Sequence, residues 1–433
     1  MTYRNSILDW FLYAVVIFCI FSFKFTLGGT KEAWARPDDL LILVAILILT
    51  VRRDLFRIRP SIPFKYYLAF IFAGLVSAVW NSAAGRVGLV YSVLFVLRLV
   101  EYMTFYFLGF RLARCGFNLS RTLTAYVIVL AIVIPLQMMG VIPVPGAFAA
   151  GRATGNANGP YELAVVSAFL LCYLGFQQRQ RLNGALAVVF IVLSASRITF
   201  AATLVTLLRA YFRRAKSSRT WATIIITTVT GLALSLGGVS LWILNAHDGS
   251  ESGDSYTISN RLSGTNLHAL GEAAVSVYKL VPAYNTSEEY IRGQFLSATG
   301  DSDQFGEQDV SSFIRVFRWT SLVRSTVAHV DSCLIGLGPS FGSAAVDGYY
   351  VRLFIETGIV GLLLFLRFAK ALLNDGANKL GFFRDYVFIL LVTAGFIDIF
   401  TSYKAMILLW LWHGMNQYQV TQAPAANRVP DAG

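Results

Sequence analysis

The sequence predicts an all-α polytopic membrane protein with about twelve transmembrane helices and one large loop outside the cytoplasm. Of its 433 residues, 56% are hydrophobic and only 14% are charged, whereas soluble domains carry about 25% charged residues. The mean hydropathy is +0.60. The apolar residues gather in runs of about 14 to 23 residues, and one run of that length can cross a bilayer as a helix.

The expected spans follow one another along most of the chain, with boundaries set to within a few residues. They cover, in order, 6–26, 38–51, 66–80, 88–109, 122–142, 160–176, 183–197, 199–212, 221–244, 348–369, 385–399 and 403–418. Helices one to nine therefore occupy 1–244, helices ten to twelve occupy 348–420, and 421–433 form a tail. No small-residue cleavage site follows the first run, so we expect a retained helix and not a signal peptide.

Lys and Arg residues predict the orientation, because the cytoplasmic connections of membrane proteins carry an excess of them. The basic connections are RRDLFRIRPSIPFK (52–65), RLARCGFNLSR (111–121), QQRQR (177–181), RRAKSSR (213–219) and the segment 370–384. The alternate connections hold single basic residues such as Arg86 and Arg152. Both termini are therefore expected in the cytoplasm. The net charge of +12 is mostly this topological signal, and its spread over short loops argues against nucleic-acid binding.

Residues 245–347 form the one long connection, on the side away from the cytoplasm. Within it, 309–330 predict an amphipathic helix, on which Arg315 and Arg318 share a face because they lie three residues apart. Its apolar stripe consists of Phe313, Val316, Phe317, Val323 and Val327. Turn-forming residues follow at Gly336, Gly338, Pro339 and Gly342. The two arginines are equally typical of a solvated helix face or of lipid headgroup contact.

Two further outward connections carry polar groups. The segment GRATGNANGPYELA (151–164) offers donors at Arg152, Asn156 and Asn158, but it lacks the G-K-[ST] of a phosphate loop. The segment LSASRITF (193–200) predicts a tight turn with Ser196 and Arg197. Either segment alone is also typical of an ordinary polar turn. "GDSD" (300–303) imitates a metal-binding D-x-D motif, but nucleotide sugars are absent outside the cytoplasm, so we expect no metal there.

Arginines on the outer side run against the topology rule. They are Arg152, Arg197, Arg315, Arg318 and Arg352. The planar fork of Arg suits phosphate oxygens, so this excess favours a bound anion next to the membrane. A membrane-adjacent anion with outward access suggests a lipid diphosphate. Glycosyl transfer on this side needs a sugar donor that is already activated and anchored, such as a polyprenyl-diphosphate oligosaccharide.

Short motifs occur in a defined order on the expected outer side. They are R-x-x-G-N-x-N (Arg152, Gly155, Asn156, Asn158), S-x-S-R (Ser194, Ser196, Arg197), R-x-x-R-W (Arg315, Arg318, Trp319), G-x-G (Gly336, Gly338) and the start of the next span (Asp347, Gly348, Val351, Glu356, Gly358). Over about residues 150–365, this set resembles the O-antigen polymerase/ligase superfamily of integral membrane glycosyltransferases. The resemblance implies a GT-C-like helical membrane architecture in a bacterial inner membrane, with the active site facing the periplasm.

One departure from that family concerns Asp347, which stands where the ligases carry His. A role specific to His cannot be carried over, and the change favours the polymerases, among which the chain is similar to exopolysaccharide polymerases of the xanthan type. The resemblance implies polymerisation of polyprenyl-diphosphate-linked repeat units. The partners are then these lipid-linked substrates, membrane lipids and a chain-length regulator, without nucleic acid, cofactor or metal.

The expected chemistry is inverting glycosyl transfer onto an acceptor hydroxyl. Arg197, Arg315 and Arg318 would stabilise the leaving diphosphate, and Asp347 would accept the hydroxyl proton. The expected substrate-binding residues are Arg152, Asn156, Asn158, Ser196, Tyr349 and Arg352.

Each of these assignments has an alternative from the residues themselves. Asp347 is equally typical of a helix cap, and Tyr349 of an interfacial aromatic belt. Arg352 and Glu356 are spaced as an i, i+4 ion pair that would make both tolerable in a membrane. The alternative functions are a ligase that moves the glycan to another acceptor, and a transporter or flippase of lipid-linked sugars. Transporters usually show two related halves, and no internal repeat is visible.

Overall fold

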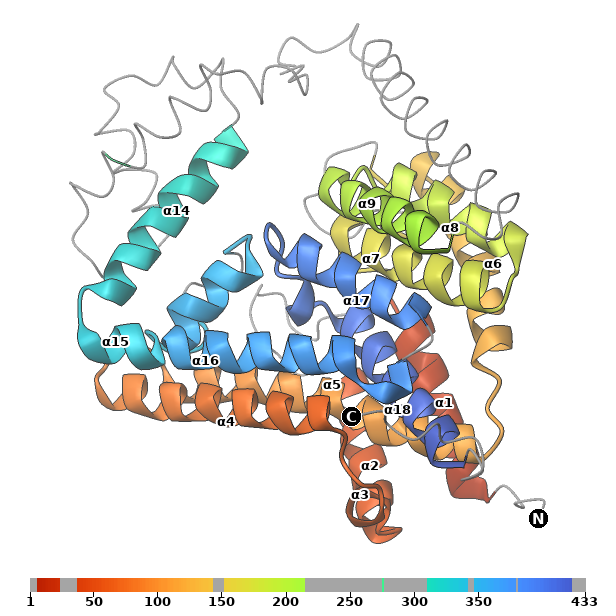
Figure 1. Ribbon diagram of the computed structural model, residues 1–433, viewed down its shortest axis with the longest axis horizontal. Helices are drawn as coiled ribbons and strands as arrows, with labels where there is room; N and C mark the ends of the chain where they lie inside the picture. Colours follow the sequence, from red (N-terminus) through yellow and green to blue (C-terminus); the bar gives the residue numbers. More distant parts are fainter. Residues whose placement is uncertain are drawn as a thin grey trace, which may run out of the picture.

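The computed structural model describes residues 6–23, 37–142, 152–214, 275, 310–341, 346–378 and 381–422, and its regular elements in these ranges are helices (Figure 1). The first part of the chain contains α1 (Ile7–Phe21), α2 (Pro37–Val51), α3 (Asp54–Arg57), α4 (Ile62–Ala83), α5 (Leu89–Arg114) and α6 (Leu119–Met138). The middle contains α7 (Pro160–Leu170), the π-helix η1 (Leu171–Gln177), α8 (Arg181–Leu193) and α9 (Arg197–Arg214). The last part contains α14 (Val310–Val327), α15 (Val330–Ile335), α16 (Tyr349–Asn374), η3 (Gly376–Asn378), α17 (Gly381–Ala394), η4 (Ile399–Thr401) and α18 (Tyr403–Gln422).

The expected helical class is confirmed for the described part of the chain. Each expected span there coincides with a helix, whereas span 221–244 and most of the loop 245–347 lie outside the described residues. By length and composition, α4, α5, α6 and the continuous α7–η1 segment can cross a membrane. Helices α1 and α8 are also apolar but shorter. The expected amphipathic helix 309–330 is present as α14.

The core of the bundle is built around α18, in which every residue from Tyr403 to Asn416 is buried. Its Trp410 and Trp412 are fully buried, and α18 packs along the length of α5. Glycines allow this close approach, because a Cβ on Gly109 of α5 or on Gly414 of α18 would overlap a backbone carbonyl of the facing helix. Small residues at helix contacts are typical of membrane bundles.

A network of charges joins α1, the α2–α3 connection, α3 and α5 at the expected cytoplasmic end. Asp9 is almost fully buried, and its Oδ1 lies 2.6 Å from Arg52 Nη1 and 3.0 Å from Arg111 Nη2. Asp54 lies 3.8 Å from Arg111 Nη1. Two carboxylates thus face two guanidinium groups, and this balance makes their burial tolerable.

At the opposite end, the short helix α15 is attached to the end of α4. Asp331 Oδ2 lies 2.9 Å from Arg86 Nη1 and accepts a hydrogen bond from Trp80 Nε1 at 3.3 Å. Desolvation raises the pKa of the Asp331 carboxyl, but the hydrogen bonds from Trp80 and Arg86 outweigh it, so the pKa lies below its ordinary value. Asp331 therefore stays ionised at neutral pH and holds α15 in place.

Helix α16 is broken near its middle. The segment that contains α15 and residues 336–341, here called the outer segment, packs against the break. Gly358 has a φ of 64°, outside the helical region. Figure 1 shows the two arms of α16, with α15 at the break and α4 alongside the longer arm. Sharp kinks in helices need an identifiable cause, and here it is the docking of the 334–338 backbone against Gly358.

Candidate active site

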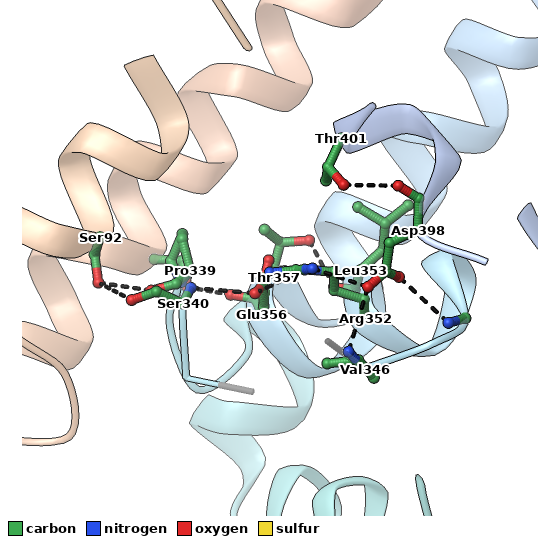
Figure 2. Close-up of polar contacts among 12 residues, drawn as sticks. Ser92, Pro339, Ser340, Val346, Arg352, Leu353, Glu356, Thr357, Asp398 and Thr401 are labelled. Atoms are coloured by element: carbon green, nitrogen blue, oxygen red, sulfur yellow. Dashed lines mark hydrogen bonds and ion pairs between the residues drawn. The ribbon is translucent and has the colours of Figure 1, made fainter. Parts of the chain in front are cut away.

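The first turns of α16 hold a buried arginine between two carboxylates (Figure 2). Arg352 is 3% exposed. Its Nε lies 3.1 Å from Glu356 Oε1, and its Nη1 lies 2.9 Å from Asp398 Oδ2. The guanidinium also lies over the ring of Phe95 on α5, 4.7 Å from its centroid. The expected Arg352–Glu356 pair is confirmed, and Asp398 joins it from the connection between α17 and η4.

Asp398 also binds the turn that carries Asp347. Its Oδ2 accepts the Val346 N–H and its Oδ1 accepts the Gly348 N–H, both at 3.3 Å. Asp347 between them has a φ of 53°, in the left-handed region that side chains other than Gly seldom adopt. The N-cap of α16 is Gly348, so the alternative in which Asp347 is the helix cap is not supported. Asp347 is half-buried and lies one residue before the cap.

Trp319 of α14 holds the same turn from the other side. Its indole Nε1 donates to the Val346 carbonyl at 2.7 Å. A Cβ on Gly348 would come within 2.6 Å of the Trp319 ring, so the ring lies directly against the backbone. The R-x-x-R-W helix is thereby placed beside the Asp347 turn. Of its arginines, Arg318 is half-buried, and the side chain of Arg315 lies outside the described residues.

The hydrogen bond from Trp319 gives a direct test of this attachment. Replacing Trp319 with Phe keeps an aromatic ring against Gly348 but leaves the Val346 carbonyl without the indole donor. We expect a loss of about 1 kcal/mol in the free energy of unfolding, measured by denaturation in mixed micelles. Trp10→Phe is the matched control, because Trp10 is exposed. Equal effects of the two substitutions would contradict the attachment.

The G-x-G segment fills the break in α16. Leu337 N–H donates to the Ile355 carbonyl at 2.7 Å, and Ser77 Oγ donates to the Glu356 carbonyl at 2.7 Å. Asn81 Nδ2 donates to the Gly336 carbonyl at 3.1 Å. Helix breaks in a membrane need such partners because no water is available to the freed backbone groups. The outer segment is therefore a structural part of the bundle.

The same segment reaches the buried charges. The Ser340 N–H donates to Glu356 Oε1 at 3.1 Å, and Ser92 Oγ of α5 donates to the Pro339 carbonyl at 2.7 Å. Figure 2 shows a continuous line of polar contacts from Ser92 through Glu356 and Arg352 to Asp398. Contacts from α5, the 336–341 turn, α16 and the α17–η4 connection thus converge on one network.

A second group of expected site residues meets at the start of α9. Arg152 Nε lies 3.3 Å from the Ser194 carbonyl, and its Nη2 lies 3.4 Å from the Ala195 carbonyl. Its guanidinium also lies 4.9 Å from the centroid of the Tyr161 ring. The two motifs expected to bind an anion are therefore adjacent. Arg197 is exposed at the first residue of α9, in a position accessible to a ligand.

Ser196, Asn156 and Asn158 have different environments. Ser196 is buried, and its Oγ donates to Thr199 Oγ1 at 2.9 Å. Asn156 is buried, with Nδ2 2.9 Å from the Phe21 carbonyl and Oδ1 2.6 Å from Tyr126 OH. The Asn158 side chain is exposed. Of these three, only Asn158 is placed where a substrate can reach it without rearrangement.

Burial also changes the interpretation of Tyr349 and Arg352. Tyr349 is 2% exposed, and its ring centroid lies 5.1 Å from that of Phe365 and 5.3 Å from that of Phe400. Arg352 faces two carboxylates, so its charge is already compensated. Both residues therefore support the site from within the bundle, and contact with a sugar or a diphosphate would require them to leave these partners.

The sequence analysis assigned no site role to Asp398 or Glu162, which belong with Lys404 to the polar interior. Glu162 Oε1 accepts the Lys404 N–H at 2.8 Å, and Lys404 Nζ donates to the Ile20 and Ser22 carbonyls at 2.7 and 2.8 Å. Lys404 thereby caps the C-terminal end of α1, where a cation is favoured. A weak signal was present, because each of these residues is a charge at the edge of an apolar run. Among the described residues, no group of three His, Cys, Asp or Glu side chains is arranged to hold a metal ion.

Comparisons with protein-family models, with curated proteins and with solved structures give no match. The function is therefore inferred from the residues of the site.

Proposed function

We propose that the protein is an integral membrane glycosyltransferase that polymerises polyprenyl-diphosphate-linked oligosaccharide repeat units into exopolysaccharide. In this proposal twelve helices span the bacterial inner membrane with both termini in the cytoplasm. The active site then faces the periplasm, on the side of α14, the Asp347 turn and the start of α9. The observation that supports it most is the Asp347 turn itself, a half-buried carboxylate in a left-handed backbone, held by Trp319 and Asp398.

The proposed reaction uses a carboxylate and arginines. The hydroxyl of an incoming repeat unit attacks the anomeric carbon of the growing chain, and the bond from that carbon to the diphosphate oxygen breaks. Asp347 accepts the hydroxyl proton. The leaving polyprenyl diphosphate carries the negative charge, which the guanidinium groups of Arg197, Arg315 and Arg318 stabilise, with Arg152 behind Arg197. Attack from the face opposite the leaving group inverts the anomeric configuration.

The buried network explains why Asp347 suits this role better than its neighbours. Glu356 and Asp398 both form ion pairs with Arg352 inside the bundle. Asp347 directly precedes Gly348, the N-cap of α16, and its side chain is partly exposed. A general base has to be reachable by the hydroxyl it deprotonates. Strained backbone that the surrounding structure holds in place is also typical of active sites.

The test uses purified protein in lipid nanodiscs, supplied with polyprenyl-diphosphate repeat units and a chelator but no nucleotide sugar. We expect a ladder of longer glycans on a gel. Asp347→Asn should lower the rate at least about 100-fold, and Arg197→Ala about 100- to 1,000-fold, as the loss of a preorganised donor does elsewhere. Arg181→Ala is the matched control, because Arg181 is exposed at the start of α8.

The alternative functions are distinguished in the same nanodiscs when a separate glycan acceptor is added and the leaflet of the lipid-linked unit is followed. A ligase would transfer a single glycan to an added acceptor and produce no ladder. A transporter would move the lipid-linked unit between leaflets without changing its length. Either result, with wild-type protein that remains folded, would contradict the polymerase proposal.

A further inference from the structure

Asp398 lies far from Asp347 in the sequence but binds the backbone on both sides of it. Its two carboxylate oxygens accept the N–H groups of Val346 and Gly348, the residues directly before and after Asp347. Asp398 belongs to the connection between α17 and η4, and its own carbonyl accepts the Thr401 hydroxyl at 2.6 Å. The last connection of the helical bundle is thereby joined to the beginning of α16.

Because Asp398 accepts hydrogen bonds from both flanking amides, the direction of the Asp347 side chain is restricted. The φ of Asp347, 53°, costs about 1–2 kcal/mol relative to the right-handed region for a residue with a Cβ. Such a conformation persists only where surrounding contacts determine it. One carboxylate that bridges two successive turn amides is a contact of this kind. Trp319 supplies the other, through the Val346 carbonyl.

Arg352 in turn orients Asp398. Its Nη1 lies 2.9 Å from Asp398 Oδ2, and Glu356 holds the same guanidinium through Nε. The side chain of Asp398 is thus restrained by a charge-assisted bond from α16 and by two backbone donors. Asp398 and Arg352 thus support the Asp347 turn through hydrogen bonds. Enzymes use such supporting contacts to keep reactive groups within a fraction of an ångström of their working positions.

We propose that Asp398 is a positioning residue for Asp347, which it holds toward the outer face through the flanking amides. This role rests on the proposed function only for its effect on catalysis, because the effect on the conformation of the turn can be measured without any substrate. Asp398 does not contact the reacting atoms in this proposal. Its loss therefore lowers kcat and leaves KM for the lipid-linked substrate nearly unchanged.

The first measurement follows the turn itself. In a background in which the four natural cysteines are replaced by serine, Asp347→Cys is labelled with a membrane-impermeant maleimide. We expect Asp398→Asn to change the labelling rate several-fold, because an uncharged amide is a weaker hydrogen-bond acceptor for the N–H groups of Val346 and Gly348 than a carboxylate is. Asp375→Asn is the matched control. Asp375 also accepts a turn amide, from Ala377 at 3.0 Å, but in the connection between α16 and α17.

The second measurement follows catalysis in the otherwise unmodified protein. We expect Asp398→Asn to lower kcat about 100-fold, the loss typical of a misplaced catalytic group. Asp398→Glu retains the charge for Arg352 and should recover part of this loss. If Asp398→Asn fails to fold, the Asp398→Glu variant carries both measurements, with altered labelling and lowered kcat as the expected result.

The outcomes separate the two proposals. Unchanged labelling together with unchanged kcat, in an enzyme that is active, would overturn the positioning role and leave the polymerase function standing. Altered labelling in a protein whose wild type makes no glycan ladder would support the positioning of the turn and contradict the polymerase function.

Discussion

Replacement of Arg352 with Met is expected to lower the free energy of unfolding by about 3–5 kcal/mol. Arg352 is buried between Glu356 and Asp398. Removal of the guanidinium leaves two carboxylates close together without a cation, and a buried charge without its partner is strongly unfavourable. Arg352→Lys should rescue only part of the loss, because a single ammonium cannot reproduce the two directed contacts of the guanidinium.

The measurement is the unfolding midpoint of the purified protein in mixed micelles. Arg121→Met is the control, because Arg121 is exposed, and its effect should stay within about 0.5 kcal/mol. A triple variant, Arg352→Met with Glu356→Gln and Asp398→Asn, should be more stable than Arg352→Met alone, since it removes the uncompensated charges. If Arg352→Met is as stable as the control, the network does not hold the site together.

Substitution of Gly358 by Ala is expected to release the outer segment from the bundle. A Cβ at this position would overlap the Leu334 carbonyl and come within 2.6 Å of the Gly336 nitrogen. These are backbone atoms, so no side-chain rotation relieves the overlap. The φ of 64° adds strain of about 1–2 kcal/mol. We therefore expect a fall in stability beyond that strain, together with loss of glycan synthesis.

Cys333 reports on this change directly, because it is half-buried on α15. Its labelling by a thiol reagent should become faster when α15 leaves the break in α16. Gly85→Ala is the matched control. Gly85 has a φ of 71°, close to that of Gly358, but its Cβ would meet nothing within 4 Å. The control carries the same backbone strain without the overlap, so equal effects of the two substitutions would show that close packing is not the cause.

The expected helices were correct where apolar runs were long and bounded by charge. The run at 66–80 became the longer α4, and 348–369 became α16, because a helix continues past its apolar stretch until caps or turns end it. The break at Gly358 was not expected. Its glycine was noted only as part of a motif, and the sequence contains no local signal that another segment would occupy the break.

In the site, too, contacts within one helix were predictable and contacts between distant segments were not. The Arg352–Glu356 pair was predictable because an i, i+4 spacing places two side chains together on any helix. Arg152 contacts the 194–195 turn, and no spacing rule predicted this contact, although both segments were expected on the same side of the membrane. Tyr349 was expected to face substrate, but its position against Phe365 and Phe400 depends on how α16 packs.

The sequence by itself determined the helical class, the order of the helices and the apolar character of those that are long enough to cross a membrane. These features depend on composition and on spacing along a single helix. Only the tertiary structure decided that Asp398 binds Arg352 and the amides beside Asp347. Those partners lie 46 to 52 residues from Asp398 in the chain. Such contacts exist only once helices have packed, because the burial that makes a charge seek its partner arises from the packing itself.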